Sequence, residues 1–435
     1  MKINTTILTR MFFLIFLVTL ATPTVRYRLN PGNEKELKGA IETTSKPSFS
    51  VKGWLDESYQ QGFEAYSNQH FGFRNSMVRL HNQISFSLFR KTNARDVIIG
   101  KEDYLYERNY IRAFYGEDFK DDSIISERVS RLKTLNDSLR SKGKLLMVVF
   151  SPGKGQFYPE YIPDYLKSNP GRTNYQAWKE IADAKGLTII DFNNWFLQMK
   201  GKSEFPIYPK TGIHWSQYGV DLVIDSLLNY IEIRQGVDLP DYIITERFLS
   251  TDYEHPDTDL EDGMNLIFPI PNVPMAYSRY TFIKEGKSKP KIMVISDSFF
   301  WPIFSKGINE MVFDNGEFWY YNQEIYTPDR EAGRPVASAD LGQTLSMMDV
   351  VVLMVTDANL PDFPWGFDQQ AVAAISPDAE RVQAEKEARI RGYIDAIMNS
   401  PEWKKSIQDK AIQNNITFEE QLRLDAIYML ENEVK

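Results

Sequence analysis

Three short, fully apolar segments constrain the fold of this chain more than any other feature. They span residues 292–295, 145–150 and 350–355, and each is followed directly by small polar residues. Segments of this length, bounded by turn residues, are typical of buried strands. Helical patterns such as 132–142 and 177–185 alternate with them. The sequence therefore predicts an α/β fold: a mainly parallel sheet with helices on both faces.

The segment at 292–295 ends in Ser-Asp-Ser, and the second of these serines, Ser298, is the candidate nucleophile. In parallel α/β sheets, reactive groups gather at the carboxyl ends of the strands. A serine on a tight turn there presents its hydroxyl to a cleft, where backbone N–H groups stabilise an oxyanion. The alternative is a structural serine, because serines are common at strand ends.

His214 is one of only four histidines and precedes a strongly patterned helix. Ser216 is a favourable N-cap residue, and apolar residues recur at helical spacing from Val220 to Ile231. An imidazole held at this point by the adjacent Trp215 can accept a proton from a serine hydroxyl. The alternative is a histidine that only packs or caps.

Composition narrows the classes of function. At 435 residues the chain is long enough for two or three domains. Its net charge of −9 argues against a nucleic-acid partner, because phosphates require a basic surface. The sequence contains no cysteine, which excludes disulfides, thiolate nucleophiles and cysteine-based zinc sites.

Two further motifs resemble ligand sites but lack residues that such sites require. Residues 251–263 are acidic, but Asp262 stands where a calcium loop requires glycine, so a solvated loop is the default. Gly153 and Lys154 follow a strand, yet they lack the spacing of a phosphate-binding loop. We therefore expect neither a metal nor a soluble cofactor.

The N-terminus indicates export. Lys2 and Arg10 precede an apolar run at 11–25, which is the pattern of a signal peptide or an uncleaved signal anchor. We expect residues 1–28 to form this segment and the rest of the chain to lie in the periplasm. The segment is either cleaved or retained as an inner-membrane anchor. The alternative is a buried helix of a cytosolic protein.

Three regions follow the N-terminal segment. We expect a linker and helices over 29–95, the α/β domain over 96–375 and a helical extension over 376–435. The α/β domain begins with an alternating pattern around Gly100, which predicts a hairpin. The extension is rich in charged residues, with apolar residues at helical spacing, as in surface helices.

Several short motifs occur together in a characteristic order: Phe-Gly-Phe-Arg at 71–74, Ile-Ile-Gly-Lys at 98–101, Tyr-Leu-Tyr at 104–106, Tyr-Pro-Glu at 158–160, His-Trp at 214–215, Tyr-Gly at 218–219 and Asp-Ser-Phe at 297–299. Through these motifs, roughly residues 49–360 resemble the SGNH-hydrolase-like family of alginate and other polysaccharide O-acetyltransferases. The resemblance implies a circularly permuted, flavodoxin-like SGNH-hydrolase fold in which the histidine precedes the serine.

The resemblance also implies roles. Ser298 would be the nucleophile and His214 the base of an O-acetyltransferase that modifies an extracytoplasmic polysaccharide through an acetyl-serine intermediate. A membrane-bound acyl-transporting protein would supply the acetyl group. A carbohydrate esterase with the same two residues and a non-catalytic polysaccharide-binding envelope protein are the alternatives.

Two positions depart from the family pattern. Members usually carry an aspartate two residues before the histidine, where this chain has Gly212. Three interpretations stay open: another carboxylate serves, with Asp191 the first choice and Asp221 the second; a backbone carbonyl holds the ring, leaving a Ser–His dyad; or the chain binds polymer without catalysis. Ser296 stands where the Gly-Asp-Ser motif has glycine, so we expect an altered oxyanion turn.

Overall fold

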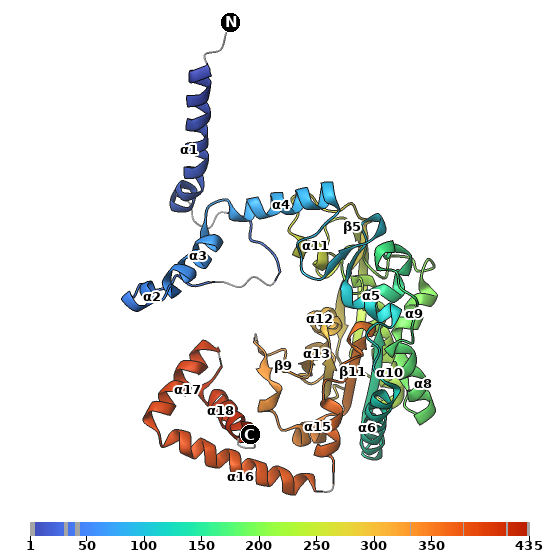
Figure 1. Ribbon diagram of the computed structural model, residues 1–435. Helices are drawn as coiled ribbons and strands as arrows, with labels where there is room; N and C mark the ends of the chain where they lie inside the picture. The colour runs from blue at the N-terminus through green and yellow to red at the C-terminus, as the bar shows by residue number, and fades with distance from the viewer. Residues whose placement is uncertain are drawn as a thin grey trace. The chain divides into compact units, whose positions relative to one another are not determined.

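The computed structural model describes residues 5–29, 34–39, 44–330, 332–376, 378–414 and 416–432. The chain forms two compact units, and Figure 1 gives the labels of their helices and strands. The first unit comprises Met1–Glu107, Lys210–Gly212 and Thr258–Asn272. The second comprises Arg108–Pro209, Ile213–Asp257 and Val273–Lys435.

The first unit is largely helical. Its elements are α1 (Thr5–Leu29), α2 (Val51–Leu55), α3 (Ser58–His70), α4 (Arg74–Phe89), β1 (Val97–Ile99), η1 (Lys101–Asp103), β2 (Leu105–Glu107) and α11 (Asp259–Met264). The predicted hairpin is confirmed, because β1 and β2 pair antiparallel with Ile98 opposite Tyr106. Within α1, Leu8–Leu29 is a 22-residue stretch with mean hydropathy 1.7, long and apolar enough to cross a membrane. Lys2 of the expected signal segment lies outside the described residues, as do 30–33 and 40–43 of the expected linker.

A seven-stranded sheet forms the core of the second unit, with strand order β10-β9-β8-β7-β11-β3-β4. Its strands are β3 (Leu145–Ser151), β4 (Ile189–Asp191), β7 (Ile292–Ser296), β8 (Glu317–Tyr320), β9 (Glu324–Tyr326), β10 (Arg334–Pro335) and β11 (Val350–Thr356). The pairs from β8 through β7, β11 and β3 to β4 are parallel, whereas β9 and β10 add an antiparallel edge. The predicted, mainly parallel sheet is confirmed.

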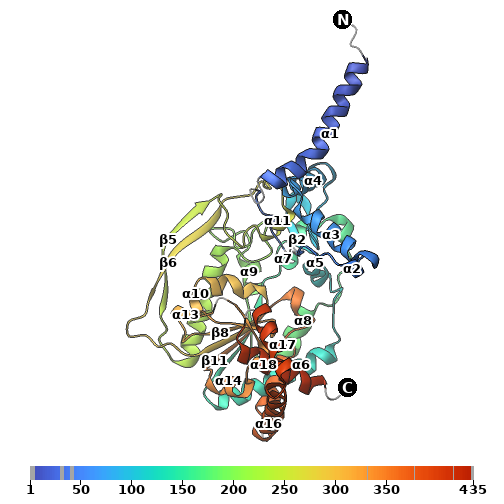
Figure 2. The same ribbon diagram turned by 90° about the vertical axis from the view of Figure 1, so that its left-hand side faces the viewer.

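Helices cover both faces of the sheet because successive side chains of a strand point to opposite sides. Leu146 and Val148 of β3 join the core cluster beneath α6 (Asp122–Ser141), α8 (Asn174–Lys185) and α15 (Phe367–Ala374). Met147, between them, faces α10 (Gln217–Gln235). In Figure 2, α10 and α13 (Ile308–Met311) lie on one side of the strands and α6 and α8 on the other.

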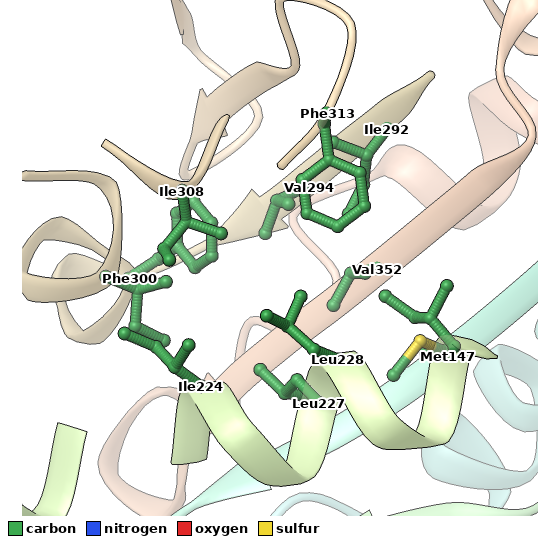
Figure 3. A pocket seen from close by; sticks show the side chains of 12 residues that line it. Met147, Ile224, Leu227, Leu228, Ile292, Val294, Phe300, Ile308, Phe313 and Val352 are labelled. Atoms are coloured by element: carbon green, nitrogen blue, oxygen red, sulfur yellow. The ribbon is translucent and has the colours of Figure 1, made fainter. Parts of the chain in front are cut away.

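The face under α10 encloses a small apolar cavity of about 20 Å³ (Figure 3). Leu227 from α10 meets Val294 of β7 and Met147 of β3 around it. Such a volume holds one water at most, and an apolar lining offers that water no hydrogen bond. The cavity is therefore a gap in core packing and not a ligand site.

The second unit contains further helices and strands. They are α5 (Arg108–Tyr115), α7 (Lys154–Phe157), η2 (Pro159–Tyr161), η3 (Asp164–Leu166), α9 (Phe192–Met199), β5 (Asp241–Ser250), β6 (Met275–Ile283), η4 (Ser298–Phe300), α12 (Trp301–Ser305), α13 (Ile308–Met311), η5 (Val336–Ser338), α14 (Leu341–Met347), η6 (Asp357–Asn359), α16 (Ala379–Met398), α17 (Pro401–Gln413) and α18 (Phe418–Asn432). The last three helices share an apolar cluster that includes Ile390, Ile407 and Ile427. The antiparallel ribbon of β5 and β6 was not predicted.

The two helices predicted at 132–142 and 177–185 begin earlier than expected. Helix α6 starts at Asp122, where the side chain of Asp121 accepts a hydrogen bond from the backbone of Ser123. Helix α8 starts at Asn174, behind a capping box formed by Thr173 and Gln176. The early turns of α6 already bury Ile125 and Val129 in the core, and the caps at Asp121 and Thr173 are the sequence signals that mark the true starts.

Candidate active site

Ser298 lies at the carboxyl end of β7, as the sequence predicted. This strand is fully buried between β11 and β8, and Ser298 is the first residue of the 3₁₀ turn η4. The side chain of Asp297 closes the turn by accepting a hydrogen bond from the backbone N–H of Phe299 at 3.1 Å. Ser298 is half-buried between the buried Asp297 and Phe299, so its hydroxyl sits at the sheet edge on a fixed turn.

A second set of hydrogen bonds ties this turn to the neighbouring strand. Oδ2 of Asp297 accepts from the backbone N–H of Thr356 at 2.8 Å, from its hydroxyl at 2.9 Å and from the Asn359 amide at 2.9 Å. Asp297 is fully buried, and these donors replace the water that a buried carboxylate loses. Sequence analysis missed Thr356 and Asn359. Both residues follow closely on the apolar segment 350–355, and this position is the signal in the sequence that could have identified them.

His214 lies in a loop that is tethered on both sides. After it, Ser216 caps α10 as predicted, with its hydroxyl accepting from the backbone N–H of Gly219 at 3.0 Å. Before it, the hydroxyl of the buried Tyr208 donates to the carbonyl of Ile213 at 2.5 Å. The backbone on either side of the imidazole is therefore held in place.

The structure brings His214 and Ser298 together across 84 positions of sequence. Nε2 of His214 lies 2.9 Å from Oγ of Ser298, a hydrogen-bonding distance. The imidazole packs against the ring of Phe299, with centroids 4.7 Å apart, and the buried Trp215 contacts the same ring at 5.4 Å. This geometry lets the imidazole accept the proton of the serine hydroxyl.

The turn also supplies a donor for an oxyanion. In the part of the chain that the structure describes, no hydrogen bond uses the backbone N–H of Ser298. Ser296, at the glycine position of the family motif, is the last residue of β7 and pairs with Tyr320 of β8. Its hydroxyl is buried without a hydrogen-bond partner among the described residues. The extra hydroxyl therefore lies inside the protein and not in the cleft.

Asp191, the first candidate for the orienting acid, is bonded to residues of α8 and α9. Its Oδ2 accepts from the Tyr175 hydroxyl at 2.6 Å and forms an ion pair with Lys179. Its Oδ1 accepts from the backbone of Asn194 and caps α9. None of the hydrogen bonds described for Asp191 involves His214, so the expectation that it orients the imidazole gains no support from this arrangement.

Asp221, the second candidate, has a structural environment. It is buried on α10 and accepts hydrogen bonds from the Tyr242 hydroxyl at 2.7 Å and the Ser278 hydroxyl at 2.6 Å. The Lys306 ammonium forms an ion pair with Oδ1 of Asp221 at 3.0 Å, the oxygen that also accepts from Tyr242. These contacts fasten the β5–β6 ribbon to α10, and they account for a buried carboxylate without a catalytic role.

Asp357 is a further buried carboxyl at this edge. It begins η6, next to Thr356, and its Oδ1 has no hydrogen-bond partner among the described residues. Burial raises its pKa to about 7, and the nearby charges of Asp118 and Asp297 act in the same direction. A Cβ atom on Gly153 would lie 1.9 Å from Oδ1 of Asp357. The glycine that resembled part of a phosphate loop is thus needed for close packing against this carboxyl.

No group of three His, Cys, Asp or Glu residues that could hold a metal ion occurs in the described ranges. In the acidic stretch 251–263, the buried Asp257 accepts a hydrogen bond from the Tyr277 hydroxyl at 2.8 Å. Burial raises the pKa of Tyr277, with the Asp257 charge as the second cause. This carboxylate therefore serves packing between the stretch and β6.

Comparison with known proteins finds one family model that matches part of the chain. The family described as the SGNH hydrolase-like domain of acetyltransferase AlgX matches residues 97–247, a range that includes His214 and ends before Ser298. Together with the parallel sheet and its helical layers, this match confirms the resemblance to the SGNH-hydrolase-like polysaccharide O-acetyltransferases and the SGNH-hydrolase-like fold. No curated protein sequence matches the chain.

Three solved structures are similar at low identity. The O-acetyltransferase domain of Pseudomonas putida AlgJ is 16% identical, with 64% of this chain and 99% of that chain covered and a TM-score of 0.41. Pseudomonas aeruginosa AlgX is 14% identical, with 64% and 66% covered and a TM-score of 0.41. Bacillus cereus PatB1 with a sulfonyl adduct is 11% identical, with 62% and 96% covered and a TM-score of 0.41.

Proposed function

We propose, from the premise that residues 97–247 match an SGNH hydrolase-like acetyltransferase domain, that this protein O-acetylates an extracytoplasmic polysaccharide through an acetyl-Ser298 intermediate. The observation that carries the proposal is the 2.9 Å separation between Nε2 of His214 and Oγ of Ser298. A serine hydroxyl is a weak nucleophile until an adjacent base accepts its proton. The family match supports acyl transfer as the chemistry for which this pair is used.

The first half-reaction loads the enzyme. Oγ of Ser298 attacks the acetyl carbonyl of the donor while Nε2 of His214 takes the hydroxyl proton. The backbone N–H of Ser298 faces the developing oxyanion and stabilises it. The intermediate then collapses, the bond to the donor breaks, and the imidazolium returns its proton to the leaving group. The product is acetyl-Ser298 with a neutral His214.

The second half-reaction unloads the enzyme onto sugar. A hydroxyl of the polysaccharide attacks the acetyl-Ser298 carbonyl, and His214 accepts its proton. The bond between the acetyl carbon and Oγ breaks, and the imidazolium reprotonates the serine. Water in place of the sugar hydroxyl would give acetate and make the protein an esterase with the same two residues.

Ser298 and His214 carry the proton transfer in this proposal. Gly212 replaces the usual aspartate, and Asp191 is bonded to Tyr175 and Lys179. The tethered loop and the ring of Phe299 help to hold the imidazole in place.

The apolar helix α1 supports a location at the inner membrane, facing the periplasm. No soluble acetyl donor is expected outside the cytoplasm, so we propose a membrane-bound acyl-transporting protein as the partner that delivers the acetyl group. The net charge of −9 remains unfavourable for a nucleic-acid partner.

The test uses an acetylated chromogenic ester, with and without an added oligosaccharide. Acetyl groups recovered on the sugar support the transferase, and acetate alone in both reactions would identify an esterase. Mass spectrometry of the rapidly quenched protein should find the acetyl group on the peptide that contains Ser298. Ser298→Ala should abolish both signals, while Ser305→Ala, an exposed serine on α12, should not. Unchanged polymer acetylation in cells with Ser298→Ala would favour a binding protein.

A further inference from the structure

Helix α4 of the first unit turns a stripe of apolar side chains outward. It contains no buried residue, and its exposed side carries Met77, Leu80, Ile84 and Leu88 at helical spacing. These side chains are 44% to 71% exposed. A surface helix of a globular protein normally turns its apolar stripe inward, so this outward stripe requires another explanation.

The side of α4 that carries Asn82 and Gln83 faces residues 264–268 of the same unit. The Asn82 amide donates to the carbonyl of Met264 at 2.7 Å. Oε1 of Gln83 accepts from the backbone N–H groups of Ile267 and Phe268 at 3.0 and 2.9 Å. These hydrogen bonds fix the rotation of the helix about its axis and thereby hold the apolar side outward.

The apolar side continues beyond α4. Ile267 and Phe268, which Gln83 holds beside the helix, are 45% and 67% exposed. Phe89 at the end of the helix is also exposed. A contiguous apolar surface of this kind marks contact with lipid or with another protein. We call this surface, made by Leu80, Ile84, Leu88, Ile267 and Phe268, the α4 face.

The structure connects the α4 face to helix α1. Gly72, in the turn before α4, packs so closely on the end of α1 that a Cβ atom there would lie 2.4 Å from the Pro23 carbonyl oxygen. The Arg26 guanidinium lies over the ring of Phe73 at 5.7 Å. Helix α4 therefore begins near the C-terminal end of α1 and runs away from it to the side (Figure 1).

The length of α1 gives the depth at which this junction lies. Its candidate membrane span Leu8–Leu29, 22 residues with Arg26 and Arg28 at the end, is about 33 Å long as a helix, close to the roughly 30 Å hydrocarbon core of a bilayer. Arg26, Tyr27 and Arg28 at its C-terminal end are residue types that sit at the membrane–water boundary. A helix that starts at this junction starts at the level of the lipid headgroups.

We propose that the α4 face lies in the interfacial layer of the membrane that α1 enters, with its apolar side chains among the lipids. The α4 sequence contains Arg74 and Arg79 but no acidic residue, which suits anionic headgroups. The aromatic cluster of Phe49, Trp54 and Tyr59 before it consists of residue types favoured at the same depth. This proposal is independent of the chemistry at Ser298.

The absence of cysteine from the sequence allows a direct test. Leu80→Cys, Ile84→Cys and Leu88→Cys would each receive a nitroxide label in the full-length chain, reconstituted into vesicles of phosphatidylethanolamine and phosphatidylglycerol. Ile412→Cys on α17, which is 81% exposed in the second unit, is the matched control. Power-saturation EPR then compares collisions of each label with oxygen, which partitions into lipid, and with a water-soluble nickel complex. Thermal unfolding of each variant checks that the fold is retained.

We expect the three α4 labels to collide at least five times less often with the nickel complex than the Ile412 label, and more often with oxygen. Equal nickel accessibility at all four positions in vesicles would overturn the proposal. Protection that occurs in native membranes but not in lipid vesicles would also overturn it, because the occupant would then be a membrane protein. Acetyl transfer by the same preparations reports on Ser298 separately.

Discussion

The carboxylate of Asp297 is joined to the backbone of Thr356 by a 2.8 Å hydrogen bond between two neighbouring parallel strands. Asp297 immediately precedes the candidate nucleophile, and Thr356 ends β11. One oxygen of this carboxylate accepts three hydrogen bonds while the other closes the serine turn. The position of Ser298 is thus fixed by the end of β11 as well as by the end of β7, the strand that precedes it.

Asp297→Asn tests this coupling. The amide would turn an NH₂ group toward at least one of the donors of Thr356, Asn359 or Phe299, so a buried donor loses its acceptor. We expect a loss of about 1–3 kcal/mol in the free energy of unfolding, together with reduced acetyl transfer. Urea denaturation and the transfer assay measure both. Asp314→Asn, at an exposed position, is the control, and equal stability of the two variants would contradict the coupling.

Ser298→Ala and His214→Ala test the dyad. Each change removes one partner of the 2.9 Å hydrogen bond, and residues that act as a unit lose activity to a similar extent. We expect roughly 10³-fold or greater loss of acetyl transfer in each single variant, with little further loss in the double variant. Steady-state rates with the ester donor give the comparison. Losses that multiply in the double variant would show that the two side chains act separately.

Tyr208→Phe tests the tether of the histidine loop. The change removes the hydrogen bond to the Ile213 carbonyl, which is worth about 1 kcal/mol, or roughly a fivefold change in rate. Because this hydroxyl positions His214 and does not contact substrate in our proposal, kcat should fall while KM is unchanged. Tyr165→Phe, at an exposed position, should have no effect. A change confined to KM would argue against the positioning role.

Asp357 should make stability depend on pH. Burial raises its folded-state pKa to about 7 from the ordinary value of 3.8. Between these pH values the folded state therefore binds more protons than the unfolded state. The free energy of unfolding should fall as the pH rises from about 4 through 7, because the buried carboxyl must then ionise. The upper limit of this loss is about 4 kcal/mol.

Asp357→Asn removes the titrating group and should flatten the decline. The measurement is the free energy of unfolding in urea at pH 4 to 8 for the parent and the variant. Asp183→Asn, at an exposed position on α8, should keep the parental profile. Parallel profiles for the parent and Asp357→Asn would show that the carboxyl does not titrate in this range.

The local sequence was sufficient to predict the elements that position the site. The apolar segments at 145–150, 292–295 and 350–355 became β3, β7 and β11. The Ser216 cap was also predicted correctly. Strands and helix starts are both marked by local patterns that extend over only a few residues. The short strands β9 and β10 and the β5–β6 ribbon were missed. Their pairing partners, not their own patterns, stabilise them.

The sequence by itself determined the three central strands β3, β7 and β11, the start of α10 and the residue types that follow these strands. Only the tertiary structure decided which of those side chains meet. It placed His214 against Ser298, bonded Asp191 to Lys179 and set Gly153 against Asp357. The physical reason is that hydrophobic periodicity is a local property of the chain, whereas a hydrogen-bond partner is chosen by the register of strands that are far apart in sequence.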